Sequence, residues 1–200
     1  MRALELARTL PGGKRISAAI VATILATVAL EGGYVNHPAD PGAETNKGIT
    51  KKVAVAAGYT GPMRTIPDDV VFGIYHDDYL VKPGFAPLEP IDAAATAEVF
   101  DTAVNMGPAR PSRFLQASIN VLCGAQLKVD GKVGPATVAA FRACQDRIGR
   151  TDLCLGMLVL LDARQRDEYD RLVTANASLK VFHRGWISKR IGNVDRKRCL

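Results

Sequence analysis

The sequence has few cysteines and histidines, and none of them are grouped as metal ligands. It contains four cysteines and three histidines: Cys123, Cys144, Cys154, Cys199, His37, His76 and His183. No CxxC pair occurs, and no cysteine and histidine stand at the short spacings of zinc sites. We therefore expect neither a metal nor an organic cofactor. The cysteines form one or two disulfides if the chain is exported, or else remain buried free thiols.

Repetitive and disordered structures are excluded by what the sequence lacks. Alternating polar and apolar stretches, the pattern of half-buried strands, are nearly absent, and there is no internal repeat. Hydrophobic residues make up 48% of the 200 residues and charged residues 23%, as in ordinary folded proteins. This length corresponds to one domain or to two small ones. The fold class is expected to be mainly α with a small β element, an α+β protein.

Positive charge is concentrated at the C-terminal end. Residues 180–200 hold seven lysines and arginines against the single acid Asp195, which accounts for the whole net charge of +6. A basic end favours an anionic partner such as nucleic acid, lipid head groups or bacterial wall polymer, unless it is only a solvated tail. No aromatic residues alternate with these cations as a stacking platform for bases, so we expect no nucleic acid partner.

The N-terminal part combines a basic leader with an apolar run. Residues 1–15 form the leader, and ISAAIVATILATVAL, residues 16–30, follows without one charge. As a helix this run would be about 22 Å long, shorter than the roughly 30 Å hydrocarbon core of a bilayer. It also lacks the polar face of a surface helix. It is therefore either a weak membrane segment or an all-apolar core helix.

Helix signals dominate the rest of the chain. Turn residues crowd residues 31–50, where we expect a loop or short hairpin that supplies the β element near residues 33–50. Helices are predicted over residues 51–58, 67–80, 91–104, 111–121, 135–148 and 152–175, with a last short helix around residues 182–186. Pro135 marks a helix start, because proline suits the first helical position.

The most informative chemistry lies in the glycine-rich segment that begins with Glu31. A carboxyl group between an apolar helix and Gly32-Gly33 is partly desolvated, which raises its pKa and suits a general acid. Asp40 follows nine residues later, after a reversal of the chain, and Thr45 could hold a water molecule. Glycoside hydrolysis uses such a pair of carboxyl groups. Alternatively, Glu31 caps a turn and Asp40 belongs to an Asx-turn.

The segment EGGYVNHPADPGAETNKGIT, residues 31–50, resembles the signature of glycoside hydrolase family 108, the N-acetylmuramidases of phages and their bacterial relatives. The resemblance implies that Glu31 is the catalytic acid. The order of Glu31, Asp40 and Thr45 is also similar to the Glu-Asp-Thr triad of phage-type lysozymes, in which the aspartate and threonine position the attacking water. The gap from Asp40 to Thr45 is one residue shorter here.

Three later segments continue this resemblance and imply a lysozyme-like fold. Residues 100–120 and 130–141 look like the peptidoglycan-binding element of the family, and FHRGWISKR, residues 182–190, matches its closing element. Asn105 could line the sugar cleft or hold a buried turn. Trp186 could stack on a sugar or anchor the core. The implied organisation is a leader at 1–15, an apolar helix at 16–30 within a catalytic region at 16–92, and a peptidoglycan-binding-like region at 93–195, which forms a domain or a lobe of one body.

The resemblance implies a peptidoglycan-degrading muramidase that acts as a monomeric phage endolysin in the bacterial periplasm. Because Lys14 and Arg15 precede the apolar run, that run also resembles a signal-arrest-release segment, which inserts transiently in the inner membrane before release. The alternative function is a non-catalytic peptidoglycan-binding or secretion-accessory protein with the same fold. The sequence leaves the stereochemistry of hydrolysis, the host range and the cysteine pairing open.

Overall fold

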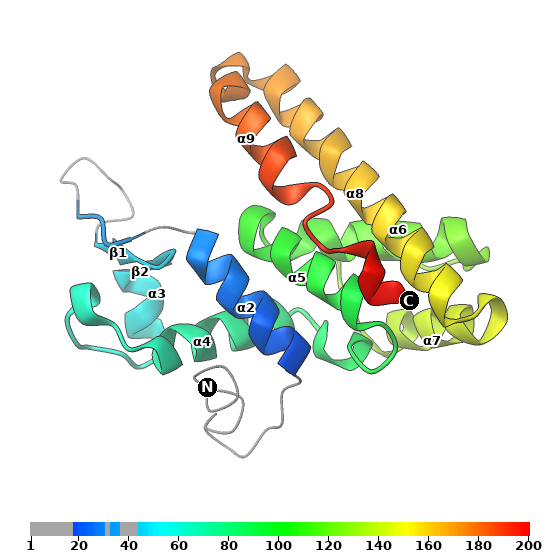
Figure 1. The fold of residues 1–200 in the computed structure, drawn as a ribbon, viewed down its shortest axis with the longest axis horizontal. Coiled ribbons are helices and arrows are strands. Elements are labelled where there is room, and N and C mark those ends of the chain that lie inside the picture. Colours follow the sequence, from blue (N-terminus) through cyan, green and yellow to red (C-terminus); the bar gives the residue numbers. More distant parts are fainter. Residues whose placement is uncertain (1–17, 31–32, 37–43) are drawn as a thin grey trace. The chain divides into compact units, whose positions relative to one another are not determined.

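The computed structural model describes residues 18–30, 33–36 and 44–200, and the chain divides into two compact units (Figure 1). Unit 1 is Met1–Asp78 and unit 2 is Tyr79–Leu200. Helices hold most of the described residues of each unit, and a two-stranded sheet lies near residues 33–50. The expected mainly α fold with a small β element is therefore confirmed. Glu31 and Asp40 lie outside the described residues.

The described part of unit 1 consists of short helices and a hairpin. Its elements are α2 (Ala18–Leu30), β1 (Thr45–Asn46), β2 (Ile49–Thr50), α3 (Lys51–Ala56), the 3-10 helix η1 (Met63–Thr65) and α4 (Asp68–His76). A π-helical turn, η2 (Asp77–Val81), continues α4, so the predicted helix over residues 67–80 is an α-helix that widens at its end. Thr50 caps α3, because its hydroxyl accepts a hydrogen bond from the amide of Val53.

The hairpin turns over Lys47 and Gly48. Both residues have positive φ angles, 51° and 74°, as a two-residue turn between antiparallel strands requires. Thr45 pairs with Thr50 and Asn46 with Ile49. The strained turn is held from outside, since the hydroxyl of Tyr75 donates to the carbonyl oxygen of Lys47 at 3.0 Å. The hairpin is thus fixed to α4.

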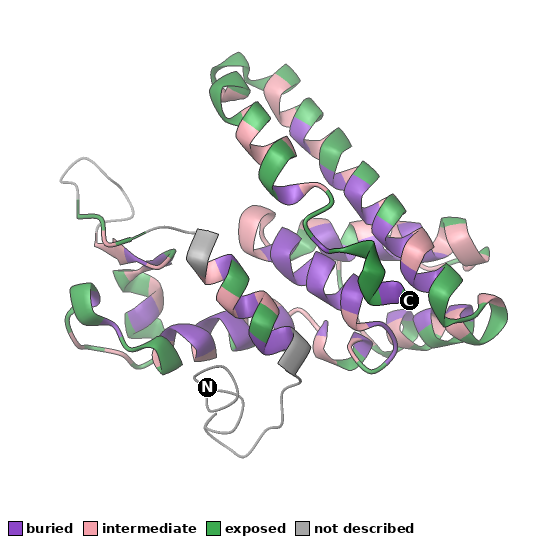
Figure 2. Cartoon of the chain, in the orientation of Figure 1, coloured by how far each residue is buried: buried purple, intermediate pink, exposed green. Residues whose placement is uncertain are grey.

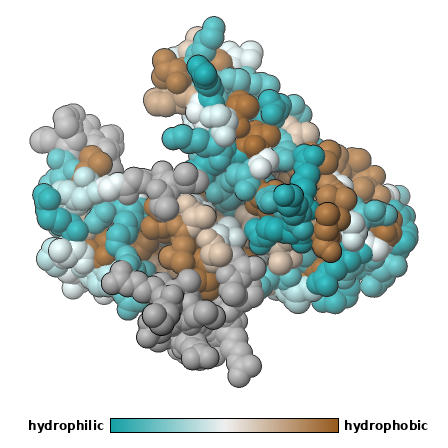
Figure 3. All heavy atoms as spheres, viewed as in Figure 1, coloured by the Kyte–Doolittle hydropathy of each residue, from teal (hydrophilic) through white to brown (hydrophobic). Residues whose placement is uncertain are grey.

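Helix α2 packs its larger side chains inward although it has no polar face. Ile20, Val21, Ile24 and Thr27 are buried, and α2 contacts α4. The exposed positions of the helix include Ala22 and Ala26, and Figure 3 shows hydrophobic residues over this part of unit 1. None of the helices in the described ranges is both long and apolar enough to cross a membrane.

Unit 2 is helical throughout its described elements. These are η3 (Ala86–Leu88), α5 (Ala93–Met106), α6 (Ala109–Cys123), α7 (Pro135–Ile148), α8 (Arg150–Ala175), η4 (Ala177–Leu179), α9 (Lys180–Arg190) and η5 (Arg196–Cys199). Helix α6 contacts α5, α7 and α8, and α9 runs beside α8 (Figure 1). The buried residues of these helices, drawn purple in Figure 2, include Phe100, Leu115, Phe141 and Leu158.

All four cysteines are paired in unit 2. Cys123 at the end of α6 bonds to Cys144 in α7, with 5.6 Å between their Cα atoms. Cys154 in α8 bonds to Cys199 in η5, with 5.5 Å between their Cα atoms. Both distances are normal for disulfides. The cysteines are therefore disulfides rather than free thiols, and the second bond ties the basic C-terminal end to the longest helix.

Candidate functional site

The candidate catalytic residues belong to two segments that the structure pairs with each other. The amide of Val35 donates to the carbonyl oxygen of Thr45, and the amide of Thr45 donates to that of Val35, both at 2.8 Å. Val35 lies four residues after Glu31, and Thr45 lies five residues after Asp40. The backbone that leads away from the predicted acid is therefore joined to the residue predicted to hold water.

Thr45 is available for such a role. It lies in β1 and is half-buried, and its backbone pairs with Val35 and Thr50. Within the described part of the chain, no hydrogen bond of its side-chain hydroxyl is found. The roles of Glu31, Asp40 and Thr45 in catalysis remain predictions, because the first two lie outside the described residues.

A side-chain contact reinforces this backbone pairing. The hydroxyl of Tyr34 donates to Oε1 of Glu44 at 2.9 Å, and Lys51 forms an ion pair with Oε2 of Glu44 at 3.1 Å. The guanidinium of Arg64 lies over the ring of Tyr34, 4.3 Å from its centroid. The hydrogen bond from Tyr34, followed by that from Lys51, lowers the pKa of Glu44. Glu44 is thus held as a carboxylate directly before Thr45.

Sequence analysis did not single out Glu44 and Tyr34. The sequence signal for these two residues was their position. Tyr34 closes the EGGY element that begins with Glu31, and Glu44 directly precedes Thr45. A glutamate in a turn-rich segment is usually solvated, so its link to Tyr34 depends on the register between two segments separated by the loop. That register is visible only in the folded chain.

Asn105 and Trp186, the two predicted substrate-binding residues, are connected through Tyr169. The hydroxyl of Tyr169 donates to Oδ1 of Asn105 at 2.7 Å. The ring of Trp186 stacks on that of Tyr169, with 5.1 Å between centroids, and on that of Phe182, with 6.0 Å. Burial raises the pKa of Tyr169, so its hydroxyl stays protonated as a donor. Sugar binding by Asn105 and Trp186 remains a prediction.

A buried polar network joins the 100–107 segment to the C-terminal end. Arg190 donates to Oδ1 of Asp101 at 2.8 Å, and Asn193 donates to Oδ2 at 2.9 Å. Glu98 lies one helical turn before Asp101 and is buried, with Oε1 unpaired in the described structure. Burial, together with the charges of Asp162 and Asp101, raises the pKa of Glu98 well above its ordinary value. These contacts fix α5 to α9 rather than forming an open site.

The DGKVGPAT segment is folded around Gln116 of α6. The side-chain amide of Gln116 donates to Oδ1 of Asp130 at 2.9 Å and to the carbonyl oxygen of Lys132 at 3.0 Å. Its carbonyl oxygen accepts from the amide of Gly131 at 2.9 Å. Gln116 is fully buried, so these hydrogen bonds satisfy it and define the loop shape.

A metal centre is not found in the described ranges, where no three histidine, cysteine, aspartate or glutamate side chains gather as ligands.

Comparison with known proteins assigns families to both parts of the chain. Residues 24–107 match the family described as Glycosyl hydrolase 108. Residues 110–191 match the one described as Predicted Peptidoglycan domain. The chain unites a glycosyl hydrolase 108 region with a predicted peptidoglycan domain. The boundary between the two matches falls inside unit 2, after α5.

A solved structure is similar to this chain over nearly its whole length. It is titled "Structure of Brucella abortus SagA", with 25% sequence identity, a TM-score of 0.60, and coverage of 89% of this chain and 91% of that chain. No curated protein matches this chain. The two family matches support a glycoside hydrolase that degrades peptidoglycan, with peptidoglycan as its partner.

Proposed function

We propose that this glycoside hydrolase is an N-acetylmuramidase and acts as a phage endolysin. Glu31 protonates the leaving oxygen between N-acetylmuramic acid and N-acetylglucosamine. Asp40, helped by Thr45, activates or orients water on the opposite face of the sugar. The observation that carries the proposal is the backbone pairing of Val35 with Thr45, which links the segment after Glu31 to the strand that holds Thr45.

Lysis of outer-membrane-permeabilised cells tests the assignment of the acid. We expect Glu31→Gln to abolish the fall in turbidity, because an amide cannot donate the proton. Glu89→Gln, a matched change in unit 2, should lyse at the wild-type rate. If Glu31→Gln lyses as fast as wild type, the assignment is wrong. If the wild type binds walls without lysing them, the chain is a peptidoglycan-binding or secretion-accessory protein.

The reducing ends of the released fragments test the bond that is cut. A muramidase leaves N-acetylmuramic acid there, a glucosaminidase leaves N-acetylglucosamine, and a lytic transglycosylase leaves a 1,6-anhydro ring. Proton NMR of the first anomer distinguishes retention from inversion, which require carboxyl groups about 5 Å or about 6.5–9.5 Å apart. Only the muramidase product agrees with the proposal.

Asp40 and Thr45 are tested by changes that keep the backbone of the loop and strand. Asp40→Asn retains an Asx-type side chain, and Thr45→Ala retains the strand pairing while removing the hydroxyl. We expect a strong loss of turnover for the first and a smaller loss for the second, with unchanged thermal unfolding. Near-wild-type turnover of Asp40→Asn would show that another group positions the water.

The proposed location is the periplasm, reached through a transient membrane stage. Both disulfides favour an oxidising compartment. The uncharged run 16–30, preceded by Lys14 and Arg15, suits weak insertion with the leader inside. After release the same run forms α2 within unit 1, immediately before Glu31, so membrane escape would also complete the site.

Fractionation of cells that produce the Glu31→Gln form tests this location without killing the host. We expect a pool in the inner membrane that shifts to the periplasm when the membrane potential collapses. Recovery entirely in the cytosol would overturn the membrane stage and favour a soluble enzyme that leaves through a holin pore. Replacing Ala22 with Arg should abolish the membrane pool, because a charge within the run prevents insertion.

A further inference from the structure

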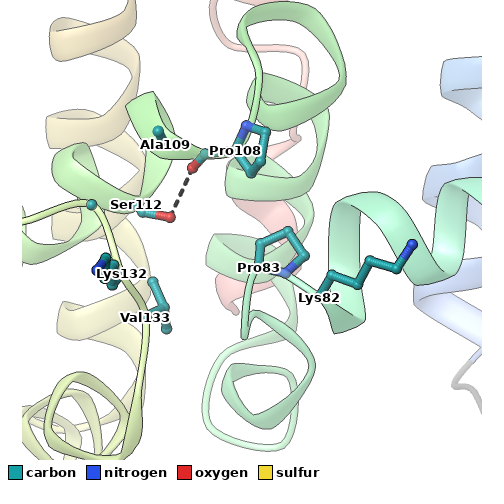
Figure 4. A pocket seen from close by; sticks show the side chains of 8 residues that line it. Lys82, Pro83, Pro108, Ala109, Ser112, Lys132 and Val133 are labelled. Atoms are coloured by element: carbon teal, nitrogen blue, oxygen red, sulfur yellow. Dashed lines mark hydrogen bonds between the residues drawn. The ribbon is translucent and has the colours of Figure 1, made fainter.

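Unit 2 contains a pocket whose lining residues all belong to this unit. Its volume is about 260 Å³. The lining residues come from three stretches of chain: Lys82, Pro83, Pro108, Ala109, Ser112, Gly131, Lys132 and Val133 (Figure 4). The last three belong to the DGKVGPAT loop. This loop lies in the region that matches the predicted peptidoglycan domain, which makes its pocket a candidate for wall binding.

Close backbone contacts shape the walls of the pocket before any ligand binds. A Cβ atom at Gly84, where φ is +85°, would overlap the carbonyl oxygen of Val133. A Cβ atom at Gly131 would lie 3.1 Å from the carbonyl oxygen of Ala109. Together with the hydrogen bonds of Gln116, these contacts hold the loop against the start of α6. The loop therefore loses little conformational entropy when a ligand binds in the pocket.

The lining suits small apolar groups rather than sugar rings. Pro83, Pro108, Ala109 and Val133 supply short apolar surfaces, and none of the eight lining residues is aromatic. The hydroxyl of Ser112 already donates to the carbonyl oxygen of Pro108 at 2.7 Å, so it is left to act as an acceptor. A saccharide needs several donors and acceptors or an aromatic face, which this lining does not offer.

Positive charge at the rim adds a preference for a carboxylate. Lys132 lines the pocket, and the guanidinium carbon of Arg113 lies 3.3 Å from where a Cβ of Gly131 would stand. Both side chains are exposed, and no carboxylate in the described part of the chain pairs with either. Lys82 contributes less, because its side chain extends away from the other lining residues (Figure 4).

We propose that this pocket binds the stem peptide of peptidoglycan. Alanyl methyl groups of the peptide lie against Pro83, Pro108 and Val133, and a peptide carboxylate is held by Lys132 and Arg113. The proposal rests on peptidoglycan as the partner. It adds that the wall is recognised in unit 2 by its peptide, whereas the proposed cleavage in unit 1 concerns its glycan.

Calorimetric titration of the full chain carrying Glu31→Gln tests the proposal. The probe is the tripeptide L-alanyl-γ-D-glutamyl-diaminopimelate. We expect Lys132→Met and Arg113→Gln each to weaken its binding by roughly tenfold, the effect of losing one charge-assisted hydrogen bond. Arg166→Gln, which removes an exposed charge on α8, should bind as tightly as the parent. The tripeptide with amidated carboxyl groups should bind weakly to every form.

The possible outcomes separate this proposal from the enzymatic one. Equal binding of the amidated peptide, or unchanged affinity in both pocket variants, overturns the carboxylate site. Binding of an N-acetylglucosamine tetramer with the same sensitivity to Lys132→Met would show that the pocket takes glycan instead. Because Glu31→Gln is inactive in the proposed mechanism, peptide binding is measured independently of hydrolysis. If the wild type lyses walls but the chain does not bind the peptide, only the proposed role of the pocket is contradicted.

Discussion

Glu44 links the two halves of the candidate catalytic segment through a single side chain. It accepts from Tyr34, three residues after Glu31, and lies directly before Thr45. Its ion pair with Lys51 is largely exposed, so it adds little to global stability. The contribution of Glu44 should therefore be to position the residues on either side.

We predict that Glu44→Gln slows wall lysis by roughly tenfold to a hundredfold, because small displacements of catalytic groups are costly. The melting temperature should change little. Tyr34→Phe should also slow lysis, since it removes the donor of this hydrogen bond, whereas glutamine at position 44 keeps an acceptor oxygen but loses the charge that strengthens the bond. Turbidity assays and circular dichroism melts measure the two effects. A loss of activity that merely follows a loss of folding would contradict a positioning role.

Glu98 must take up a proton when the chain folds at neutral pH, which opposes folding. Burial raises the pKa of Glu98 above its ordinary value of 4.5, so the folded protein keeps a proton that the unfolded chain releases. Its contribution to stability therefore falls as pH rises above the ordinary value. We predict that Glu98→Gln equals wild type in urea unfolding at pH 3.5 and exceeds it at pH 7. A difference that does not change with pH would contradict this.

At the scale of elements, the helices were predictable because their signals are local. Pro135 begins α7 as expected, and Gly149 ends it, since glycine and proline act on their own backbone. The cysteine pairing was not predictable, because four cysteines allow three pairings and only the packing of α8 against η5 selects one. Nothing in the local pattern marks Gln116, whose partners lie 14 to 16 residues away.

The DGKVGPAT loop depends on one glycine outside it. Gly84 has a positive φ and leaves no room for a side chain beside Val133. We predict that Gly84→Ala lowers the free energy of unfolding by roughly 2–4 kcal/mol, because it adds a clash to backbone strain. Gly124→Ala is the control: its φ is also positive, at +60°, but nothing lies within 4 Å, so the cost should be about 1 kcal/mol. Equal losses in urea unfolding would contradict the proposed contact.

At the scale of the whole molecule, the excess positive charge and one of the two disulfides lie at the C-terminal end of the chain. The cations of residues 180–200 account for the net charge of +6, and the Cys154–Cys199 bond fixes this end to α8. Arg190 forms a buried ion pair with Asp101, and a guanidinium nitrogen of Arg196 lies 3.5 Å from a carboxylate oxygen of Asp162. The cations that remain for an anionic wall are therefore the exposed ones outside these pairs, among them Lys180, Lys189 and Lys197.

We predict that replacing Lys180, Lys189 and Lys197 with glutamine slows lysis of permeabilised cells several-fold at low ionic strength. The change lowers the net charge of +6 by three and weakens attraction to the anionic wall. The deficit should disappear in about 1 M salt, where the Debye length falls from about 30 Å at 0.01 M to about 3 Å. Arginine at the same three positions keeps the charge and should lyse like wild type. A deficit that persists in high salt, or that the arginine form shares, would show that these side chains act by contact rather than by charge.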